Sequence, residues 1–191
     1  MSIINKAKTT ATVKALTPVI LFKLAGDLFL EFVEKNDLRD SFTNLWKKRP
    51  VISSVAIFRD LDPTAKHEIS LLAKVQNFKK DELIVRQGGK TEDFYVVSTG
   101  KVEIFRKNDN GKVTLSAELK SGDFFGENVA MGYVDKRNAS AKALTDVTTL
   151  VISSKELRDL AKRMPILKHQ LHLVMKERGM ADEILEKGLG L

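Results

Sequence analysis

The chain has 191 residues, carries 32 Lys and Arg against 25 Asp and Glu for a net charge of +7, and contains no cysteine. An apolar fraction of 43% is typical of a globular fold and excludes a disordered or collagen-like chain. Without cysteine there is no disulfide framework, thiol nucleophile or zinc-thiolate cluster, which favours a cytoplasmic location.

The basic excess is spread along the whole chain and mixed with acidic residues, with one dense cluster at residues 47–49. Proteins that bind nucleic acids gather Lys and Arg on one face and add exposed aromatic side chains or a recognition helix. We therefore expect a solvated basic surface and no nucleic-acid partner. The longest mostly apolar run, residues 19–32, is interrupted by Lys23, Asp27 and Glu31, so we expect no membrane span.

The chain begins with one copy of an internal repeat. Residues 8–19 align with residues 136–147 at a constant offset of 128, and seven of the twelve positions are identical. A strand-like stretch and then a helix-like stretch follow each copy. We therefore expect residues 1–45 to be the C-terminal remnant of a preceding repeat, with a strand at residues 20–24 and a linking helix.

Helical patterns come next along the chain. Between Asp27 and Trp46 apolar residues recur at spacings of three and four, which predicts an amphipathic helix or a pair of helices. We expect Pro50 to interrupt this helical region. Asp62 followed by Pro63 predicts another helix start, because aspartate caps free N–H groups and proline suits the first helical position.

The middle of the chain changes toward an apolar period of two, and its short runs are separated by turn residues that include the hairpin signal Asn110-Gly111. Short strands at spacings of about ten residues predict a sandwich or a closed barrel. Ser153 and Glu156 match a capping box, which predicts a helix start, and Pro165 separates that helix from a last one.

Residues 121–140 form a glycine-punctuated segment with Glu127 and Arg137 ten positions apart. The planar guanidinium of Arg137 can hold phosphate oxygens. A carboxylate would repel phosphate, so Glu127 would accept hydrogen bonds from hydroxyls, such as those of a ribose, or orient the arginine. A plain Glu127–Arg137 ion pair that closes a loop is an equally simple alternative. His169 and His172 lack a third ligand, so we expect no metal site.

The sequence also resembles a known family. Residues 84–102 are similar to the paired strands of cyclic nucleotide-binding domains. Gly-Asp-Phe-Phe-Gly-Glu at 122–127, followed by Arg-Asn-Ala-Ser at 137–140, is similar to the phosphate-binding cassette of that family. The resemblance implies an α+β, mainly β fold: a jelly-roll-like β-roll at residues 46–175, flanked by N-terminal and C-terminal helices, and a helical tail at residues 176–191.

Carried over position by position, the resemblance assigns the cyclic phosphate to the guanidinium of Arg137. It assigns the 2′-hydroxyl of the ribose to the carboxylate of Glu127. Backbone amides at Gly126 and Ala139 are expected to hold further phosphate oxygens.

The cassette departs from the family pattern at two places. Its small residue stands one position late, so a further amide comes from Ala130 if the cassette helix starts one residue late, and from Val129 if it does not. Asn138 stands where members that prefer cGMP often carry threonine, which leaves both cAMP and cGMP as candidates. In the upstream repeat copy Thr9 occupies the place of Arg137, so that copy lacks the phosphate residue.

The resemblance implies a regulatory module and not an enzyme, with no catalytic residue, metal or cofactor beyond the ligand. Binding of cAMP or cGMP would move the flanking helices and control an attached or partner effector, kinase-like or other. Leu171, Met175 and Met180 are candidates for an apolar cap over the base. The alternative is a domain that keeps the fold without the ligand and serves in protein interaction or dimerisation, with a second copy of the chain as partner.

Overall fold

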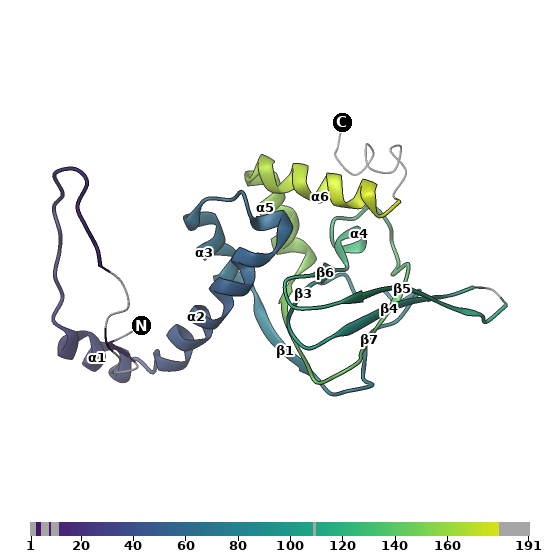
Figure 1. Ribbon diagram of the computed structural model, residues 1–191, viewed down its shortest axis with the longest axis horizontal. Helices are drawn as coiled ribbons and strands as arrows, with labels where there is room; N and C mark the ends of the chain where they lie inside the picture. Colours follow the sequence, from purple (N-terminus) through teal and green to yellow (C-terminus); the bar gives the residue numbers. More distant parts are fainter. Residues whose placement is uncertain (1–2, 5–7, 9–11, 109, 180–191) are drawn as a thin grey trace. The chain divides into compact units, whose positions relative to one another are not determined.

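The structure is a computed structural model, and it describes residues 3–4, 8, 12–108 and 110–179. The chain divides into two compact units, Met1–Lys47 and Lys48–Leu191. Figure 1 shows the order of the helices and strands along the chain. Over the described ranges, none of the helices combines the length and the apolar character that crossing a membrane requires.

The first unit contains helix α1 (Gly26–Lys35) and the beginning of helix α2 (Arg39–Ser54). The predicted amphipathic region is therefore a helix pair, and it is broken at Asp37, whose φ of 51° is left-handed. The strand expected at residues 20–24 is wrong, because this stretch is neither strand nor helix and the side chain of Phe22 is 99% exposed. A strand needs a hydrogen-bonded neighbour, and the described residues of this unit include none.

Helix α2 runs through Pro50 and ends at Ser54, so the interruption expected at the proline is wrong. Proline removes one backbone donor from a helix and crowds the preceding turn. The turn after the proline is nevertheless anchored, because Ile52 is fully buried in the apolar core of the second unit. Tertiary packing thus outweighs the local preference of the proline.

Two short helices precede the strands of the second unit, the 3-10 helix η1 (Ala56–Phe58) and helix α3 (Pro63–Leu72). The cap predicted at Asp62 is confirmed. Its carboxylate accepts hydrogen bonds from the backbone N–H groups of Thr64 at 2.8 Å and Ala65 at 2.9 Å. Both hydrogen bonds lower the pKa of Asp62, and the bond from Ala65 has the larger effect.

In the described part of the chain, eight strands form two four-stranded antiparallel sheets, ordered β1-β8-β3-β6 and β2-β7-β4-β5. The predicted β-roll with flanking helices is confirmed (Figure 1). The predicted hairpin at Asn110-Gly111 joins β4 to β5. The strands are β1 (Lys74–Phe78), β2 (Leu83–Val85), β3 (Phe94–Thr99), β4 (Val102–Lys107), β5 (Val113–Leu119), β6 (Phe124–Phe125), β7 (Ser140–Ala143) and β8 (Val147–Ile152).

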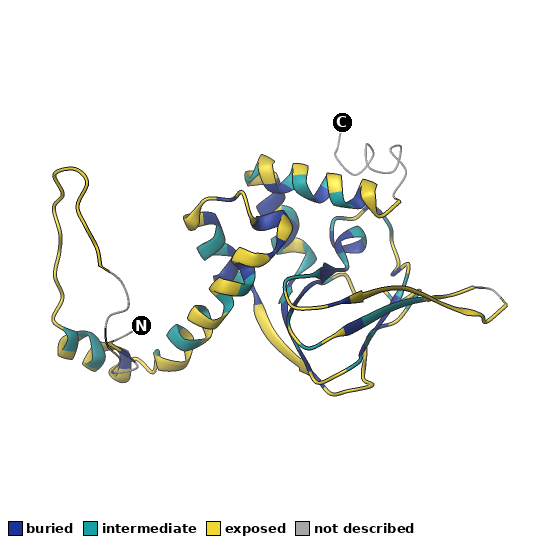
Figure 2. Ribbon diagram, in the orientation of Figure 1, coloured by how far each residue is buried: buried dark blue, intermediate teal, exposed yellow. Residues whose placement is uncertain are grey.

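Strand β3 contributes to both apolar clusters that hold the second unit together. Phe94 and Val96 belong to the helix-side cluster, which the helices share with the sheet, whereas Tyr95 and Val97 belong to the cluster between the two sheets. Successive side chains of a strand point to opposite faces, so a strand with two covered faces reads as a continuous apolar run. Figure 2 shows that the burial is concentrated where the strands and helices of this unit meet.

Helices α5 (Ser154–Arg163) and α6 (Pro165–Glu177) follow the last strand. The predicted capping box is confirmed, because the Ser153 side chain accepts from the N–H of Glu156 while the Glu156 carboxylate accepts from the N–H of Ser153. Helix α6 buries its apolar stripe, including Leu167, in the helix-side cluster. Met175, near the end of α6, is fully buried in the same cluster, so this part of the helix also packs against the second unit's core.

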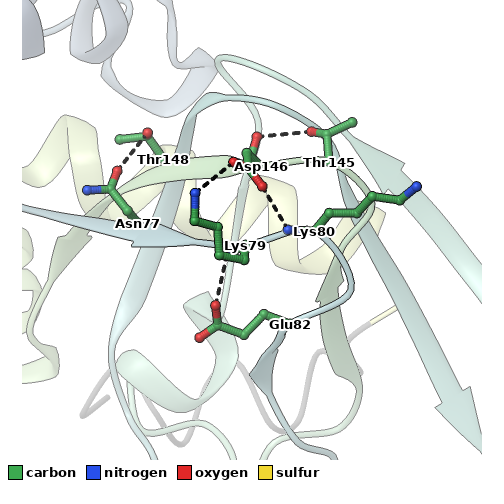
Figure 3. Close-up of polar contacts among 7 residues, drawn as sticks. All are labelled: Asn77, Lys79, Lys80, Glu82, Thr145, Asp146 and Thr148. Atoms are coloured by element: carbon green, nitrogen blue, oxygen red, sulfur yellow. Dashed lines mark hydrogen bonds and ion pairs between the residues drawn. The ribbon is translucent and has the colours of Figure 1, made fainter.

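A polar cluster joins the turn after β1 to the turn between β7 and β8 (Figure 3). The carboxylate of Asp146 accepts hydrogen bonds from the backbone N–H of Lys80 and from the ammonium of Lys79, both at 3.0 Å. The carboxylate of Glu82 accepts from the backbone N–H of Lys79 at 2.8 Å. Both hydrogen bonds to Asp146 lower the pKa of its carboxyl group, and the bond from the Lys80 N–H has the larger effect.

Replacing Asp146 by asparagine is expected to lower the Tm at neutral pH and to have little effect in strong acid. The pKa of Asp146 is lower in the folded chain than its unfolded value of about 3.9, so its stabilisation is present above that value and is lost as the pH falls through the folded pKa. Thermal denaturation from about pH 2.5 to 7 measures the difference. Asp135→Asn, at an exposed carboxylate, is the control. A Tm difference that does not vary with pH would contradict the prediction.

Candidate functional site

The second unit contains a cavity of about 290 Å³ beside the sheet β2-β7-β4-β5. Side chains of these four strands form one wall, and Phe125 of β6 with the residues that follow it forms another. A cavity of this size suits a small molecule. Of the residues predicted to bind a ligand, six line it: Gly126, Glu127, Val129, Arg137, Asn138 and Ala139.

Arg137 is a buried cation with incomplete hydrogen bonding. Its Nη2 donates to the carbonyl of Asp93 at 2.6 Å and its Nε donates to the hydroxyl of Thr91 at 3.4 Å. Its Cζ also lies 5.6 Å from the ring centroid of Tyr95. Its Nη1 is buried without a hydrogen-bond partner. An unsatisfied donor on a buried charge is destabilising, so the site is better suited to a bound anion than to an empty cavity.

The electrostatic surroundings of Arg137 lead to the same conclusion. Burial lowers the pKa of this guanidinium, and the nearby Tyr95, Asp93 and Glu127 only partly oppose the effect. Burial therefore disfavours the charged form that the guanidinium nevertheless carries. A phosphate oxygen at Nη1 would supply the missing hydrogen bond and a negative charge in direct contact with the guanidinium.

Gly126 allows the guanidinium of Arg137 to approach the backbone closely. Its φ of 89° lies in the left-handed region, and it caps the N-terminus of the short helix α4 (Glu127–Ala130). A Cβ at this position would overlap Nη1 of Arg137 and the carbonyl of Asp93. Glycine is thus required here both for the turn of the backbone and for the close approach of the guanidinium.

Glu127 is buried in the same cavity, but it does not form the ion pair with Arg137 that the sequence left open. Its Oε1 accepts instead from Nη1 of Arg178 at 3.0 Å. The two members of the predicted cassette therefore remain separate polar groups of one cavity, a carboxylate and an arginine with a free donor. This arrangement can serve a ligand that has both a phosphate and a hydroxyl.

Ala130 is the predicted site residue that the structure places elsewhere. Its N–H donates to the carbonyl of Gly126 at 3.1 Å inside helix α4, and its side chain is fully buried in the helix-side cluster. The helix does not start one residue late, so Val129 and not Ala130 lines the cavity.

Two of the three residues expected to form the apolar cap do not line the cavity. Leu171 and Met175 are fully buried in the helix-side cluster and are not among the residues that line the cavity. Met180 lies outside the described residues. The stripe of α6 faces the helices and the sheet because this is where the largest apolar area can be buried.

Two arginines of the cavity were not predicted from the sequence. Arg106 stands two positions after Ile104 on β4, so strand alternation places both on the face that lines the cavity. Arg178 directly follows helix α6, and its guanidinium donates to Glu127, 51 positions earlier in the sequence, a relation that no local pattern reveals. No group of three His, Asp or Glu residues that could hold a metal is found in the described ranges, which include His169 and His172.

Comparisons with known proteins agree with this architecture. Residues 75–164 match the family model described as cyclic nucleotide-binding domain. A cGMP-dependent protein kinase of Drosophila melanogaster is 27% identical over 89% of this chain, and a cAMP-dependent protein kinase regulatory subunit of Candida albicans is 38% identical over 48% of it. The matched part is 18% of the length of each of these two relatives.

Solved structures with the same fold include the catabolite activator protein of Thermus thermophilus. It aligns with a TM-score of 0.60 and 27% identity, covering 64% of this chain and 57% of that one. The matched residues 75–164 contain the strands of the β-roll and most of the residues that line the cavity. Residues 75–164 of the second unit therefore form a domain that matches the cyclic nucleotide-binding domain family.

Proposed function

We propose that the second unit is a regulatory module that binds cAMP or cGMP in the cavity at its cassette. The observation that carries the proposal is the buried Nη1 of Arg137, which has no partner while its guanidinium lines the cavity. The phosphate of a cyclic nucleotide supplies the acceptor and the negative charge that this group lacks.

The roles of the site residues follow from their chemistry and from the family resemblance. Arg137 holds the cyclic phosphate, and the carboxylate of Glu127 accepts from the 2′-hydroxyl of the ribose. Backbone amides at Gly126, Val129 and Ala139 take the remaining oxygens, whereas the amide of Ala130 is occupied within helix α4. Asn138 lies beside the phosphate group, and the proposal includes either base.

Isothermal titration calorimetry of the chain with cAMP and with cGMP tests the proposal. We expect binding of at least one of them, and chromatography of the recovered nucleotide should find it chemically unchanged. No heat and no thermal shift at millimolar concentrations of either nucleotide would overturn the proposal. This negative result would favour the alternative, a domain that binds no ligand and serves in protein interaction.

The proposal extends to what the ligand controls. The relatives named above include a protein kinase and the regulatory subunit of another, so a kinase-like effector, attached or separate, is the partner that fits best. The chain would work in the cytoplasm, a location that the absence of cysteine favours. A ligand-dependent change in oligomeric state would identify a second copy of the chain as the partner instead.

We also propose that residues 1–45 belong to a preceding repeat of the same fold. Their repeat partners in the second unit include β7 and β8, which occupy inner positions of their sheets with a strand on either side. Side chains such as Ile20 and Phe22 are 90% and 99% exposed here. Exposed apolar residues whose equivalents form inner strands are suited to form strands in the sheets of an upstream repeat.

Hydrogen–deuterium exchange tests the assignment of these first residues. In the chain as given, amides of residues 12–24 are expected to exchange within seconds, because they have no sheet partner. Amides of residues 140–152, the equivalent stretch of the second unit, are expected to be protected. Protection of both stretches would contradict the proposal.

A further inference from the structure

Arg106 is a cation of the cavity wall that the contacts proposed above do not use. It lies on β4 next to the edge strand β5, and it lines the cavity together with Ser116 of β5. Its guanidinium forms no hydrogen bond or ion pair with a described residue, and the same holds for the hydroxyl of Ser116. Two polar side chains of neighbouring strands are therefore available to a ligand.

An irregularity in the pairing of β4 with β5 brings Ser116 to the cavity. Ile104 of β4 pairs with Ala117 of β5. The next residue of β4, Phe105, pairs with Leu115, so Ser116 has no partner on β4. Such β-bulges redirect side chains and are frequent next to active sites. The neighbours Ser116 and Ala117 consequently both line the cavity, although successive residues of a regular strand point to opposite faces.

The guanidinium groups of Arg106 and Arg137 lie on different walls of the cavity. That of Arg137 contacts the ring of Tyr95 and the carbonyl of Asp93, at strand β3 of the sheet β1-β8-β3-β6. Arg106 belongs to the other sheet, β2-β7-β4-β5. A nucleotide with its phosphate at Arg137 and its ribose at Glu127 therefore has its base to place against the wall that the second sheet forms.

This wall is suited to a base. Its strands contribute mostly apolar side chains, which pack well against the flat face of a purine: Val85, Ile104, Ala117, Leu119 and Ala141. Three polar side chains of these strands also line the cavity, those of Arg106, Ser116 and Ser140. The hydroxyl of Ser140 already accepts a hydrogen bond from the N–H of Gln87 at 2.9 Å. Arg106 and Ser116 are therefore the groups of this wall that can read the edge of the base.

The chemistry of Arg106 distinguishes the two candidate bases. Guanine presents two neighbouring acceptors, O6 and N7, whereas adenine presents the acceptor N7 beside the donor amino group at C6. A guanidinium carries only donors, arranged in a planar fork, so it can form two hydrogen bonds with guanine. With adenine one of its donors would face the amino group, and a hydrogen bond would be lost.

We propose that Arg106, with the hydroxyl of Ser116 beside it, selects guanine, so that the ligand of the second unit is cGMP rather than cAMP. This inference rests on the proposed function and names the base that the site accepts. Arg106 is exposed, so water solvates its guanidinium in the free chain. Its contribution is therefore a preference between bases, whereas the buried Arg137 supplies the affinity for phosphate that both nucleotides share.

Isothermal titration calorimetry of the full chain with cGMP, cIMP and cAMP tests this assignment. The base of cIMP keeps O6 and N7 of guanine but lacks the 2-amino group, so it isolates the edge that Arg106 reads. A bidentate contact from arginine discriminates between bases by about tenfold to a hundredfold. We expect cGMP and cIMP to bind more tightly than cAMP by this factor, and to differ from each other by no more than about threefold.

Two substitutions of Arg106 separate base recognition from general charge. Arg106→Met removes every donor, and the preference for cGMP and cIMP over cAMP should fall to within about threefold, with the affinity for cAMP unchanged. Arg106→Gln should shift the preference toward cAMP, because the glutamine amide matches the amino group and N7 of adenine. Lys107→Met is the matched control, since it removes an exposed cation of β4 that does not line the cavity. It should retain the full preference for cGMP.

Equal losses for all three nucleotides in Arg106→Met would show that Arg106 acts through its charge alone, and would overturn the inference. An undiminished preference for cGMP in that variant, or an original chain that prefers cAMP, would overturn it as well. In each of these cases the proposed function stands, because a cyclic nucleotide still binds. If the original chain binds neither cAMP nor cGMP, the proposed function fails first and this inference fails with it.

Discussion

Replacing Arg137 by alanine is expected to lower the affinity for cAMP or cGMP by at least about a hundredfold. A guanidinium fork can make two charge-assisted hydrogen bonds to phosphate, each of about 1.5–3 kcal/mol, and each 1.4 kcal/mol is tenfold in affinity. In the ligand-free chain the same substitution has two effects. It removes a buried charge whose Nη1 has no hydrogen-bond partner, which stabilises the chain, and it removes the hydrogen bond from Nη2 to the Asp93 carbonyl, which destabilises it. These two effects oppose each other, so the stability of the unliganded chain should change by no more than about 1 kcal/mol.

Calorimetry and thermal denaturation on the same samples check both parts of this prediction. Lys136→Ala removes an exposed cation next to the arginine, and should leave the affinity unchanged if bulk positive charge is not what binds the ligand. Arg137→Lys retains the charge without the planar fork and should give an intermediate loss. Full affinity in Arg137→Ala would show that the phosphate, if one binds, is held elsewhere.

Features that depend on neighbours in sequence could be predicted without a structure. The cap at Asp62, the capping box at Ser153 and the hairpin at Asn110 each consist of groups within a few positions of one another. The same holds for the cassette, in which a tight turn at Gly126 directly precedes Glu127. Local hydrogen bonds and backbone preferences fix such features, and they are visible as residue patterns.

The predictions that failed depend on partners far away in the chain. Residues 20–24 have the composition of a strand, but a strand forms only against another strand, and the described first unit provides none. Helix α2 passes Pro50 because Ile52 is packed into the core of the second unit. Neither outcome could be obtained from the local pattern, because tertiary contacts decided both.

Six of the residues that line the cavity could be predicted from the sequence, but the contacts between its charged side chains could not. Glu127 and Arg137 were identified from their types and spacing, yet their pairing was left open. The structure settles it through Arg178, a residue 51 positions away that carries no motif. Glu127 is thus paired with Arg178, and Nη1 of Arg137 has no hydrogen-bond partner.

A glycine substitution gives the second large effect. Gly126→Ala is expected to abolish measurable nucleotide binding and to destabilise the second unit. The φ of 89° is unfavourable for alanine by about 1–3 kcal/mol. The new Cβ would also overlap Nη1 of Arg137 and the carbonyl of Asp93, so the guanidinium must leave the place in which it faces the cavity.

Gly111→Ala is the matched control for this substitution. Gly111 has a φ of 76° in the β4–β5 hairpin, and a Cβ there would meet nothing within 4 Å. Both variants therefore carry the strain of a left-handed alanine, but only Gly126→Ala displaces Arg137. We expect both to lower the Tm, and only Gly126→Ala to lose affinity for cAMP or cGMP by calorimetry. If the two variants bind nucleotide equally well, the close contact between Gly126 and the guanidinium does not organise the site, and the role assigned to Arg137 must be abandoned.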